Sequence, residues 1–537
     1  MLPILFYDFE LIMPYSFLTK NISARKFHLL ILLALLLVWQ HVFAQNNLDA
    51  DPRALSALPS NLNPINFVHL LSTRNADVLI GKLNTGVGKE LYNSESGIYE
   101  PIAYSSIKKE GRFRLNTVEE QIVSSNLPYL SEQVLTTEAG IKEKLPTGAD
   151  ASLGYQVSRR NNNLISTQTS GLFSTEYTSA LVFTLKQPLL RNAGRDMTET
   201  SKKIAELDFL ISKEQFKQQL FKSTLDGLNL YWQVYKNQRA LELHDDAFKQ
   251  SQELLKNAIA RLKAGKISES ALLEIRSMML QRSSEYQRSK QAFFDAKLKL
   301  FSSLGSKNVL GLDLYLDKDE INPVASPWLT PDTFVEPADV LKESPLFAIA
   351  TLRKQQAEIK LANLRNQTKP DLDFVMSASG NGFAYNQGDA ARDARGRTYP
   401  DWYVGFSLEV PLGGNHKASG QYAAQIERLT QAEIEINSLT ITNANDFLSV
   451  IEDSKISYQA VQQGEQEVEL QQTIYDNEMR RFMLGNTILT TVIQKSNALM
   501  DTKLRLIDNQ IKFEQTKTLF YIYSGQFFTH YGISLQS

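Results

Sequence analysis

The sequence has 537 residues, of which 22% are charged, and its formal net charge is −2. One hydrophobic core rarely grows beyond about 250–300 residues, so this length predicts either several domains or an elongated shape. A nearly neutral chain has no basic excess to bind nucleic acid, which is therefore not an expected partner. The chain contains no cysteine, which excludes disulfides, thiolate metal sites, a cysteine nucleophile and a lipid-modified N-terminal cysteine.

The N-terminal segment has the pattern of a secretory signal peptide. Basic residues precede an apolar run and a small residue suited to cleavage: Lys20, Arg25 and Lys26, then residues 29–38, then Ala44. The alternative is a membrane anchor, but ten apolar residues are well short of the roughly 20 that cross a bilayer. We therefore expect residues 1–44 to be a signal peptide, with Met13 as an alternative start.

Four later stretches alternate apolar and polar residues with a period of two, which is typical of β-strands. They lie at about 151–160, 175–187, 370–380 and 400–411. A half-buried sheet of a soluble protein would show the same alternation. Aromatic residues in the strands, and long polar loops that join each pair, favour strands that span an outer membrane. The side chains expected to face lipid are Leu153, Tyr155, Phe183, Phe374, Trp402 and Phe406.

Most of the remaining chain is predicted to be helical, because apolar residues recur at three- and four-residue steps. The segments are a helix near 76–92, a long hairpin over 196–304, a helix that opens at Ser344-Pro345 and ends near 366, and a second hairpin over 418–525. A helix over 196–262 would be roughly 100 Å long. We expect the helices 268–304 and 345–366 to lie end to end beside it, and the helix near 76–92 to complete the second half.

Landmarks recur at an offset of about 220 residues, which indicates an internal duplication. Pro188 and Pro411 each lie at the end of a predicted strand, and Gly265 and Gly485 each lie in a predicted helix turn. The expected organisation is a first structural repeat over 45–305, an equatorial linker over 306–344 that contains several prolines, and a second structural repeat over 345–537.

Four strands cannot close a barrel in a membrane. Single-chain membrane barrels begin at eight strands, and an open edge in lipid leaves backbone groups unpaired. Three copies would supply twelve strands and a lumen wider than that of an eight-stranded barrel. The sequence thus predicts a fold that is mainly α with a transmembrane β-barrel, assembled as a trimer around a water-filled conduit.

Several segments resemble the TolC-like outer-membrane efflux family. They are QPLLRNAGR at Gln187–Arg195, VPLGG at Val410–Gly414, and the two helix turns RLKAGKISESALLEI and RFMLGNTILTTVI. The resemblance extends from about residue 66 to residue 528. It implies a homotrimer in the outer membrane of a Gram-negative bacterium, with a twelve-stranded barrel, four strands per chain, on a twelve-helix periplasmic tunnel. It also implies a passive exit duct of a tripartite efflux system, with a membrane-fusion adaptor and an inner-membrane pump (RND, ABC or similar) as partners.

The resemblance places the periplasmic tip and the adaptor contacts at the two helix turns. The residues are Arg261, Gly265, Ser268, Arg481 and Gly485. Glycine permits the tight reversal, and the arginines can hydrogen-bond helix-end carbonyls or an adaptor backbone; the alternative is that these residues only build the turns. The aperture positions are Ala271, Glu274, Thr491 and Gln494. The family often has acids there and this chain keeps only Glu274, so a strongly cation-selective gate is not expected.

No motif predicts an enzyme, a cofactor or a bound metal. The six histidines form no metal-ligand spacing, and GKLNTGVGK at 81–89 lacks the Ser or Thr that a phosphate loop needs after its lysine. Alternative functions within the channel class are metal efflux and type I protein secretion. The alternative from another class is a periplasmic coiled-coil structural protein without a channel. Residues 102–138 have no predicted role beyond extending the equatorial belt.

Overall fold

The computed structural model describes residues 62–124, 126–169, 172–265, 267–305, 316, 344–396 and 399–533. These residues belong to one compact unit, Ser60–Ser537. The predicted signal peptide and nearly all of the predicted linker over 306–344 lie outside the described residues. Among the helices that the structure describes, none combines the length and the apolar character needed to cross a membrane.

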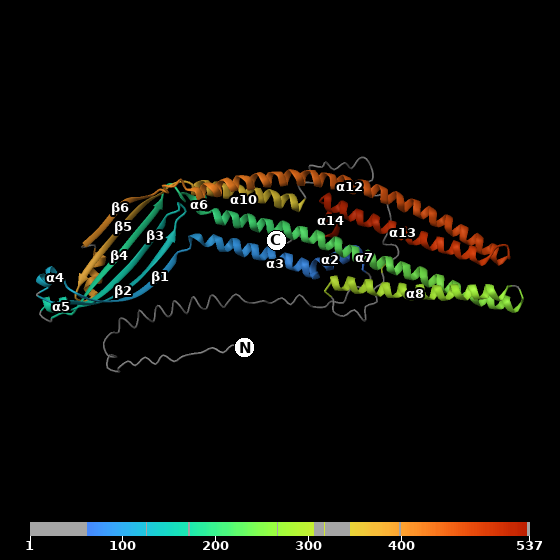
Figure 1. Ribbon diagram of the computed structural model, residues 1–537, viewed down its shortest axis with the longest axis horizontal. Coiled ribbons are helices and arrows are strands. Elements are labelled where there is room, and N and C mark those ends of the chain that lie inside the picture. Colours follow the sequence, from blue (N-terminus) through green and yellow to red (C-terminus); the bar gives the residue numbers. More distant parts are fainter. Residues whose placement is uncertain are drawn as a thin grey trace, which may run out of the picture. The chain divides into compact units, whose positions relative to one another are not determined.

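Within the described residues, six strands form one antiparallel sheet in chain order (Figure 1). They are β1 (Ile102–Leu115), β2 (Tyr129–Lys144), β3 (Asp150–Asn162), β4 (Thr175–Pro188), β5 (Asp371–Ala384) and β6 (Tyr399–Glu409). The last four match the strands predicted from the sequence. The expectation of four strands per chain is nevertheless wrong, and the segment expected to extend the belt forms β1 and β2. The run Lys108-Lys109-Glu110 interrupts the alternation of apolar and polar residues in β1, so the sequence pattern did not predict this strand.

The strand register separates the side chains into two faces. Across all six strands one row of paired residues is apolar: Ala103, Ile141, Leu153, Phe183, Ala378 and Trp402. Because side chains alternate along a strand, Tyr155, Phe374 and Phe406 lie on this same apolar face. The opposite, polar face carries cross-strand pairs such as Ser152 with Thr184, whose hydroxyl oxygens are 2.6 Å apart. All six residues predicted to face lipid therefore share one face of the sheet.

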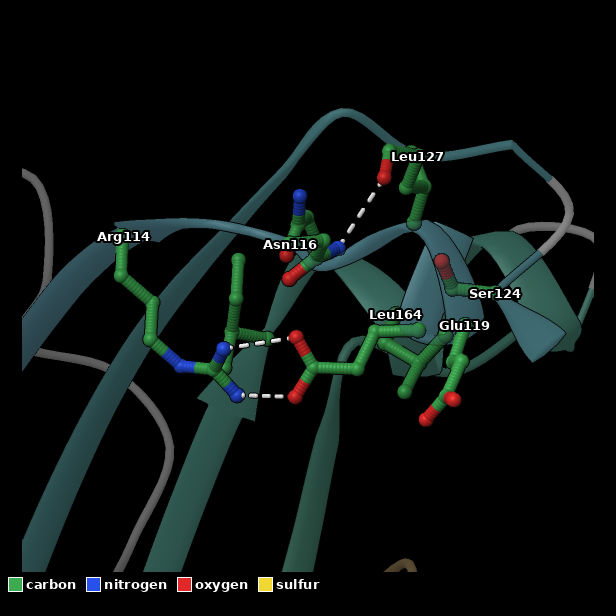
Figure 2. Close-up of a pocket in the computed structure, with 9 residues that line it drawn as sticks. Arg114, Asn116, Glu119, Ser124, Leu127 and Leu164 are labelled. Atoms are coloured by element: carbon green, nitrogen blue, oxygen red, sulfur yellow. Dashed lines mark hydrogen bonds and ion pairs between the residues drawn. The ribbon is translucent and has the colours of Figure 1, made fainter. Parts of the chain in front are cut away.

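Short helices close the three strand hairpins: α4 (Val118–Val123) between β1 and β2, α5 (Asn163–Gln168) between β3 and β4, and α11 (Gln387–Gly396) between β5 and β6. Figure 2 shows the first of these loops. Both terminal nitrogens of Arg114 donate to the carboxylate of Glu120, at 2.6 and 2.7 Å. The Glu120 side chain also accepts from the backbone N–H of Thr117, whose hydroxyl caps α4 in return. The hydrogen bond from Arg114 lowers the pKa of Glu120 to about 2, so the loop is held by a charged pair at neutral pH.

Helices make up most of the remaining described residues. They are α2 (Pro64–Arg74), α3 (Ala76–Ser96), α6 (Arg195–Thr198), α7 (Thr200–Lys263), α8 (Glu269–Ser303), α10 (Pro345–Gln367), α12 (His416–Met483), α13 (Leu489–Tyr523) and α14 (Phe527–Tyr531), with a 3-10 turn at Gly97–Tyr99. α7 packs on α8 and α12 on α13, which gives the two predicted hairpins (Figure 1). The 64 residues of α7 span roughly 96 Å at 1.5 Å per residue.

The short helices follow a different order from the one expected. Asn75 caps α3 and donates from its side-chain amide to the carbonyl oxygen of Ser303, at 2.9 Å, so α3 begins where α8 ends. Ser344, the N-cap of α10, accepts a hydrogen bond from the side chain of Asn443 of α12 at 3.0 Å. About one turn further along α12, Asp446 accepts from the hydroxyl of Tyr523, the last residue of α13. The expectation that α10 continues α8 is therefore wrong, because α3 takes that place and α10 begins beside the end of α13.

One cluster of fully buried side chains lies where α2 packs on α7. Phe67, Leu71, Tyr231 and Trp232 are at most 2% exposed, and the Tyr231 hydroxyl donates to the carbonyl oxygen of Leu62 at 2.8 Å. A second cluster joins α12 to α13 through Phe447, Val450, Phe520 and Tyr521. The first cluster fixes α2 against α7, and the second fixes α12 against α13.

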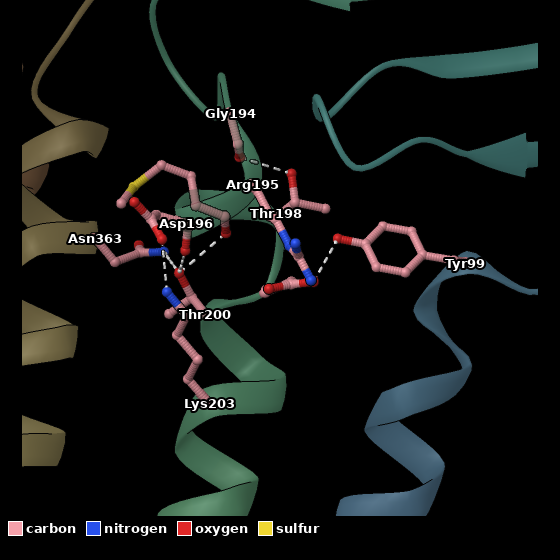
Figure 3. Close-up of polar contacts among 10 residues, drawn as sticks. Tyr99, Gly194, Arg195, Asp196, Thr198, Thr200, Lys203 and Asn363 are labelled. Carbon is pink, nitrogen blue, oxygen red and sulfur yellow. Dashed lines mark hydrogen bonds and ion pairs between the residues drawn. The ribbon is translucent and has the colours of Figure 1, made fainter.

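The junction between helices and sheet is a network of polar contacts (Figure 3). Glu199, just before α7, accepts from Tyr99 at 3.2 Å and from Arg195 at 2.9 Å. Asn363 of α10 donates to the hydroxyl of Thr200 at 3.1 Å. Hydrogen bonding to Arg195, the largest effect, lowers the pKa of Glu199 and keeps it ionised. The segment 195–200 therefore joins the start of α7 to the turn after α3 and to α10.

Candidate functional site

The two hairpin turns have closely related backbones. Gly265 and Gly485 both adopt positive φ, +65° and +81°, which favours glycine because other residues have a Cβ that clashes there. The N–H of Gly265 donates to Leu262 at 2.9 Å, and that of Gly485 to Phe482 at 3.0 Å. Each glycine satisfies a carbonyl at the end of a long helix and reverses the chain.

The helices that leave the turns are capped differently. Ser268 accepts from the N–H of Ala271 at 3.2 Å and so caps α8. The equivalent position before α13 is Ile488, which offers no capping oxygen. In that turn the hydroxyl of Thr487 donates instead to the carboxylate of Glu478, nine residues earlier in α12. The second turn is thus fastened to its preceding helix rather than to the following one.

The structure brings the two predicted tips together. A terminal nitrogen of Arg261 donates to the carbonyl oxygen of Met483 in the other hairpin, at 3.3 Å. Leu254, Ala258, Ile275 and Leu489 form a buried cluster beneath this bond, with Ile267, Leu272, Phe482 and Ile493 packed against it. The two turns therefore form one composite surface, called the tip surface below and defined by residues 261–268 and 481–488.

The two predicted arginines have different partners. Arg261 bridges the hairpins, whereas Arg481 pairs with Glu478 of its own helix at 3.1 Å. The side chain of Arg481 is 61% exposed and that of Glu478 only 10%. With Lys263 and Arg480, they place four cations in the last turns of two helices, where the helix dipole favours positive charge.

The tip surface also has an apolar part that the sequence reasoning missed. Leu484 is 76% exposed and Ile488 is 69% exposed, beside the partly exposed Met483. The corresponding residues of the first turn include Lys263 and Ala264. Comparison of the two aligned turns, rather than either one alone, is the signal that distinguishes an apolar tip from a basic one.

The four predicted aperture positions lie in the first two turns of α8 and α13. Glu274 and Gln494 are exposed, and Ala271 and Thr491 are half-buried. Within each helix the two positions are three residues apart and so share a face. Glu274 on α8 is the only charged residue among these four positions.

No protein-family profile and no curated protein matches the sequence. Solved structures do match. The outer-membrane channel CmeC of Campylobacter jejuni aligns over 86% of this chain and 86% of its own, at 11% identity and a TM-score of 0.60. The outer-membrane protein VceC of Vibrio cholerae aligns over 86% of this chain and 96% of its own, at 12% identity and a TM-score of 0.60. The open state of the MtrE outer-membrane channel of Neisseria gonorrhoeae aligns over 87% and 89%, at 12% identity and 0.59. The chain therefore has the fold of the TolC-like outer-membrane channels.

Proposed function

We propose that this chain is the exit duct of a tripartite efflux system. It assembles as a homotrimer in the outer membrane of a Gram-negative bacterium, and small molecules pass through it passively from the periplasm or the pump to the exterior. The observation that carries this proposal is the sheet: an apolar face continues across all six strands, and the strands lead into two long helical hairpins. In a membrane barrel the apolar face meets lipid and the polar face meets water.

The polar face has the chemistry of a water-filled lumen. Arg160 pairs with Glu132 at 3.5 Å and with Glu176 at 3.2 Å, and Lys186 pairs with Asp373 at 2.8 Å. Charged groups of this kind are costly in lipid and stable against water. The same arrangement favours a channel over a coiled-coil structural protein, because a coiled-coil protein needs no sheet with one apolar and one polar face.

The tip surface fits the docking of a periplasmic adaptor. It combines exposed apolar side chains at Leu484 and Ile488 with cations at Arg481 and Lys263. Protein interfaces commonly unite an apolar centre with a charged rim. In this proposal the pump selects the substrate, and the tip surface only couples the duct to the adaptor.

The test uses the chain without residues 1–44, folded into detergent and then into planar bilayers. We expect a trimer that dissociates only on heating in a denaturing gel, and ion conductance after reconstitution. A water-soluble monomer that gives no conductance would contradict the proposed function.

A further inference from the structure

The sheet ends in two free edges within the described residues. Among the strands that the structure describes, β1 pairs only with β2, and β6 pairs only with β5. Nearly every residue of both edge strands is exposed. Each edge presents a row of unpaired N–H and C=O groups, which are strongly unfavourable in lipid because no water is present to bond them.

The two edges are complementary. β1 runs away from the helices and β6 runs back toward them, because six strands alternate in direction along the chain. An edge of one copy can therefore join the opposite edge of the next copy as an antiparallel pair. We propose that β1 of one copy pairs with β6 of the next, so that three copies close a barrel of eighteen strands rather than twelve. This inference rests on the proposed function.

The hairpin of β1 and β2 has the side-chain pattern expected of strands in the wall of the barrel. Its apolar row continues that of the other strands through Ala103 and Ile141. On the polar face, Arg112 of β1 pairs with Glu132 of β2 at 3.7 Å, and Glu132 pairs in turn with Arg160 of β3. A hairpin that folded away from the barrel would need neither feature.

The register follows from the geometry of a closed ring. The residues paired in one row across the sheet are Ile102, Lys142, Ser152, Thr184, Ser377 and Tyr403. For the apolar faces of neighbouring copies to coincide, Tyr403 must pair with a residue that lies an even number of positions after Ile102 of the next copy. This number of positions is the offset between copies. Offsets of six and eight residues correspond to strand tilts of roughly 35° and 42°, both within the usual range of about 35–45°.

Charge selects between these two offsets. An offset of six places Glu110 directly opposite Asp401 of the next copy, and like charges at such positions are destabilising. An offset of eight places Arg112 opposite Asp401 and so extends the chain of ion pairs from Glu132 across the interface. It also places Ile107 opposite Phe406 on the apolar face. The expected pairing therefore brings Ser106 opposite Ser407.

A wider duct is the functional consequence. Barrel diameter grows about linearly with strand number, so a barrel of eighteen strands is about 1.5 times as wide as one of twelve. The barrel would then pass larger solutes than a twelve-stranded barrel, and the helical part would restrict flow instead.

Disulfide cross-linking tests this closure, because the natural chain has no cysteine. The variant Ser106→Cys with Ser407→Cys is compared with Ser106→Cys with Gly405→Cys, which reports the six-residue offset. A third variant, Ser152→Cys with Ser407→Cys, reports a ring of twelve strands closed between β3 and β6. All three are folded into detergent, oxidised and run on a denaturing gel after heating.

We expect covalent trimers from the first variant, roughly tenfold more than from the third, because a disulfide forms only over a short Cα separation. A preference for the second variant would overturn the eight-residue offset. Covalent trimers from the third variant alone would overturn the eighteen-stranded barrel while leaving the exit duct intact. Absence of any trimer on a gel run without oxidation or heating would overturn the proposed function as well.

Discussion

Arg261 and Arg481 occupy equivalent positions beside the two turn glycines, yet their contacts differ. Arg261 holds the two hairpins together through the carbonyl oxygen of Met483, and Arg481 is tied to Glu478 with much of its side chain exposed. Sequence reasoning left open whether the arginines build the turns or meet a partner. The structure shows a structural contact for each, and leaves Arg481 the more accessible of the two.

Charge reversal at both positions, Arg261→Glu with Arg481→Glu, is expected to weaken adaptor capture about tenfold without loss of the trimer. The reason is that hydrogen bonds to charged groups contribute roughly 1.5–3 kcal/mol, and acids are unfavourable at helix C-termini. The measurement is cross-linking to the adaptor in native membranes. The control, Arg288→Glu with Lys290→Glu, reverses as many charges on an exposed part of α8. Equal cross-linking in both variants would contradict adaptor docking at the tip.

Glu514 on α13 is a buried acid away from the tip. Its side chain is 12% exposed and lies 3.4 Å from Lys517, with Tyr521 and Tyr531 nearby. Burial raises the pKa of Glu514 despite the lysine. The folded state therefore binds this proton more tightly than the unfolded state, and its contribution to stability is complete below the unfolded pKa and lost as the pH rises through the folded pKa.

The substitution Glu514→Gln should accordingly raise the melting temperature at pH 7 and leave it unchanged near pH 4, where the natural side chain is already neutral. Thermal unfolding followed by circular dichroism at the two pH values measures this difference. Glu467→Gln is the control, since the pair of Glu467 with Arg505 is about half exposed. If Glu514→Gln instead lowers the melting temperature both at pH 7 and near pH 4, burial does not disfavour the ionised form of Glu514.

At the scale of elements, α11 illustrates how small residues let a helix rest on the sheet. Ala390 and Ala394 are fully buried where α11 packs on β4 and β5. A Cβ atom on Gly382 would overlap the carbonyl oxygen of Ala390, and one on Gly380 would overlap that of Ala394. The sequence predicted only a polar loop between the last two strands, because α11 is short and mostly polar and its apolar side chains are all alanines.

Gly382→Ala is therefore expected to lift α11 from the sheet, at a cost of about 1–3 kcal/mol for the overpacked contact. Limited trypsin digestion of the folded protein detects this as faster cleavage after Arg392 and Arg395. Gly405→Ala on β6 provides the matched control, since nothing lies within 4 Å of a Cβ at that glycine. Similar cleavage rates in the two variants would mean that the contact with Gly382 does not hold α11.

At the scale of the whole molecule, function depends on which face of the sheet meets lipid. Ser377 and Ala378 are adjacent on β5 and lie on opposite faces, the first in a row with Thr184 and the second in a row with Phe183. The apolar row is continuous from β1 to β6, so one assignment of faces holds for the entire sheet.

Ala378→Arg should lower the free energy of unfolding in a bilayer by about 2–4 kcal/mol, because a cation near the bilayer centre loses its hydration. Ser377→Arg should have little effect, since it adds a charge to a face already lined by ion pairs. The measurement is the folded fraction in phospholipid vesicles, read from heat-sensitive gel mobility across a urea series. If the two variants fold equally well, the apolar face does not meet lipid.

The sequence by itself determined the local features of this protein. A period of two identified β3 to β6, a period near 3.6 identified the long hairpins, and Gly265 and Gly485 identified the turns, because these signals depend on neighbouring residues only. Tertiary structure alone decided which elements meet. The pairing of β4 with β5 joins Pro188 to Asp373 across a long stretch of chain, and α3 follows α8 through Asn75 and Ser303. Strand β1 has too many charges to show its period, and its place at the edge of the sheet is set by its pairing with β2, a contact that no local pattern encodes.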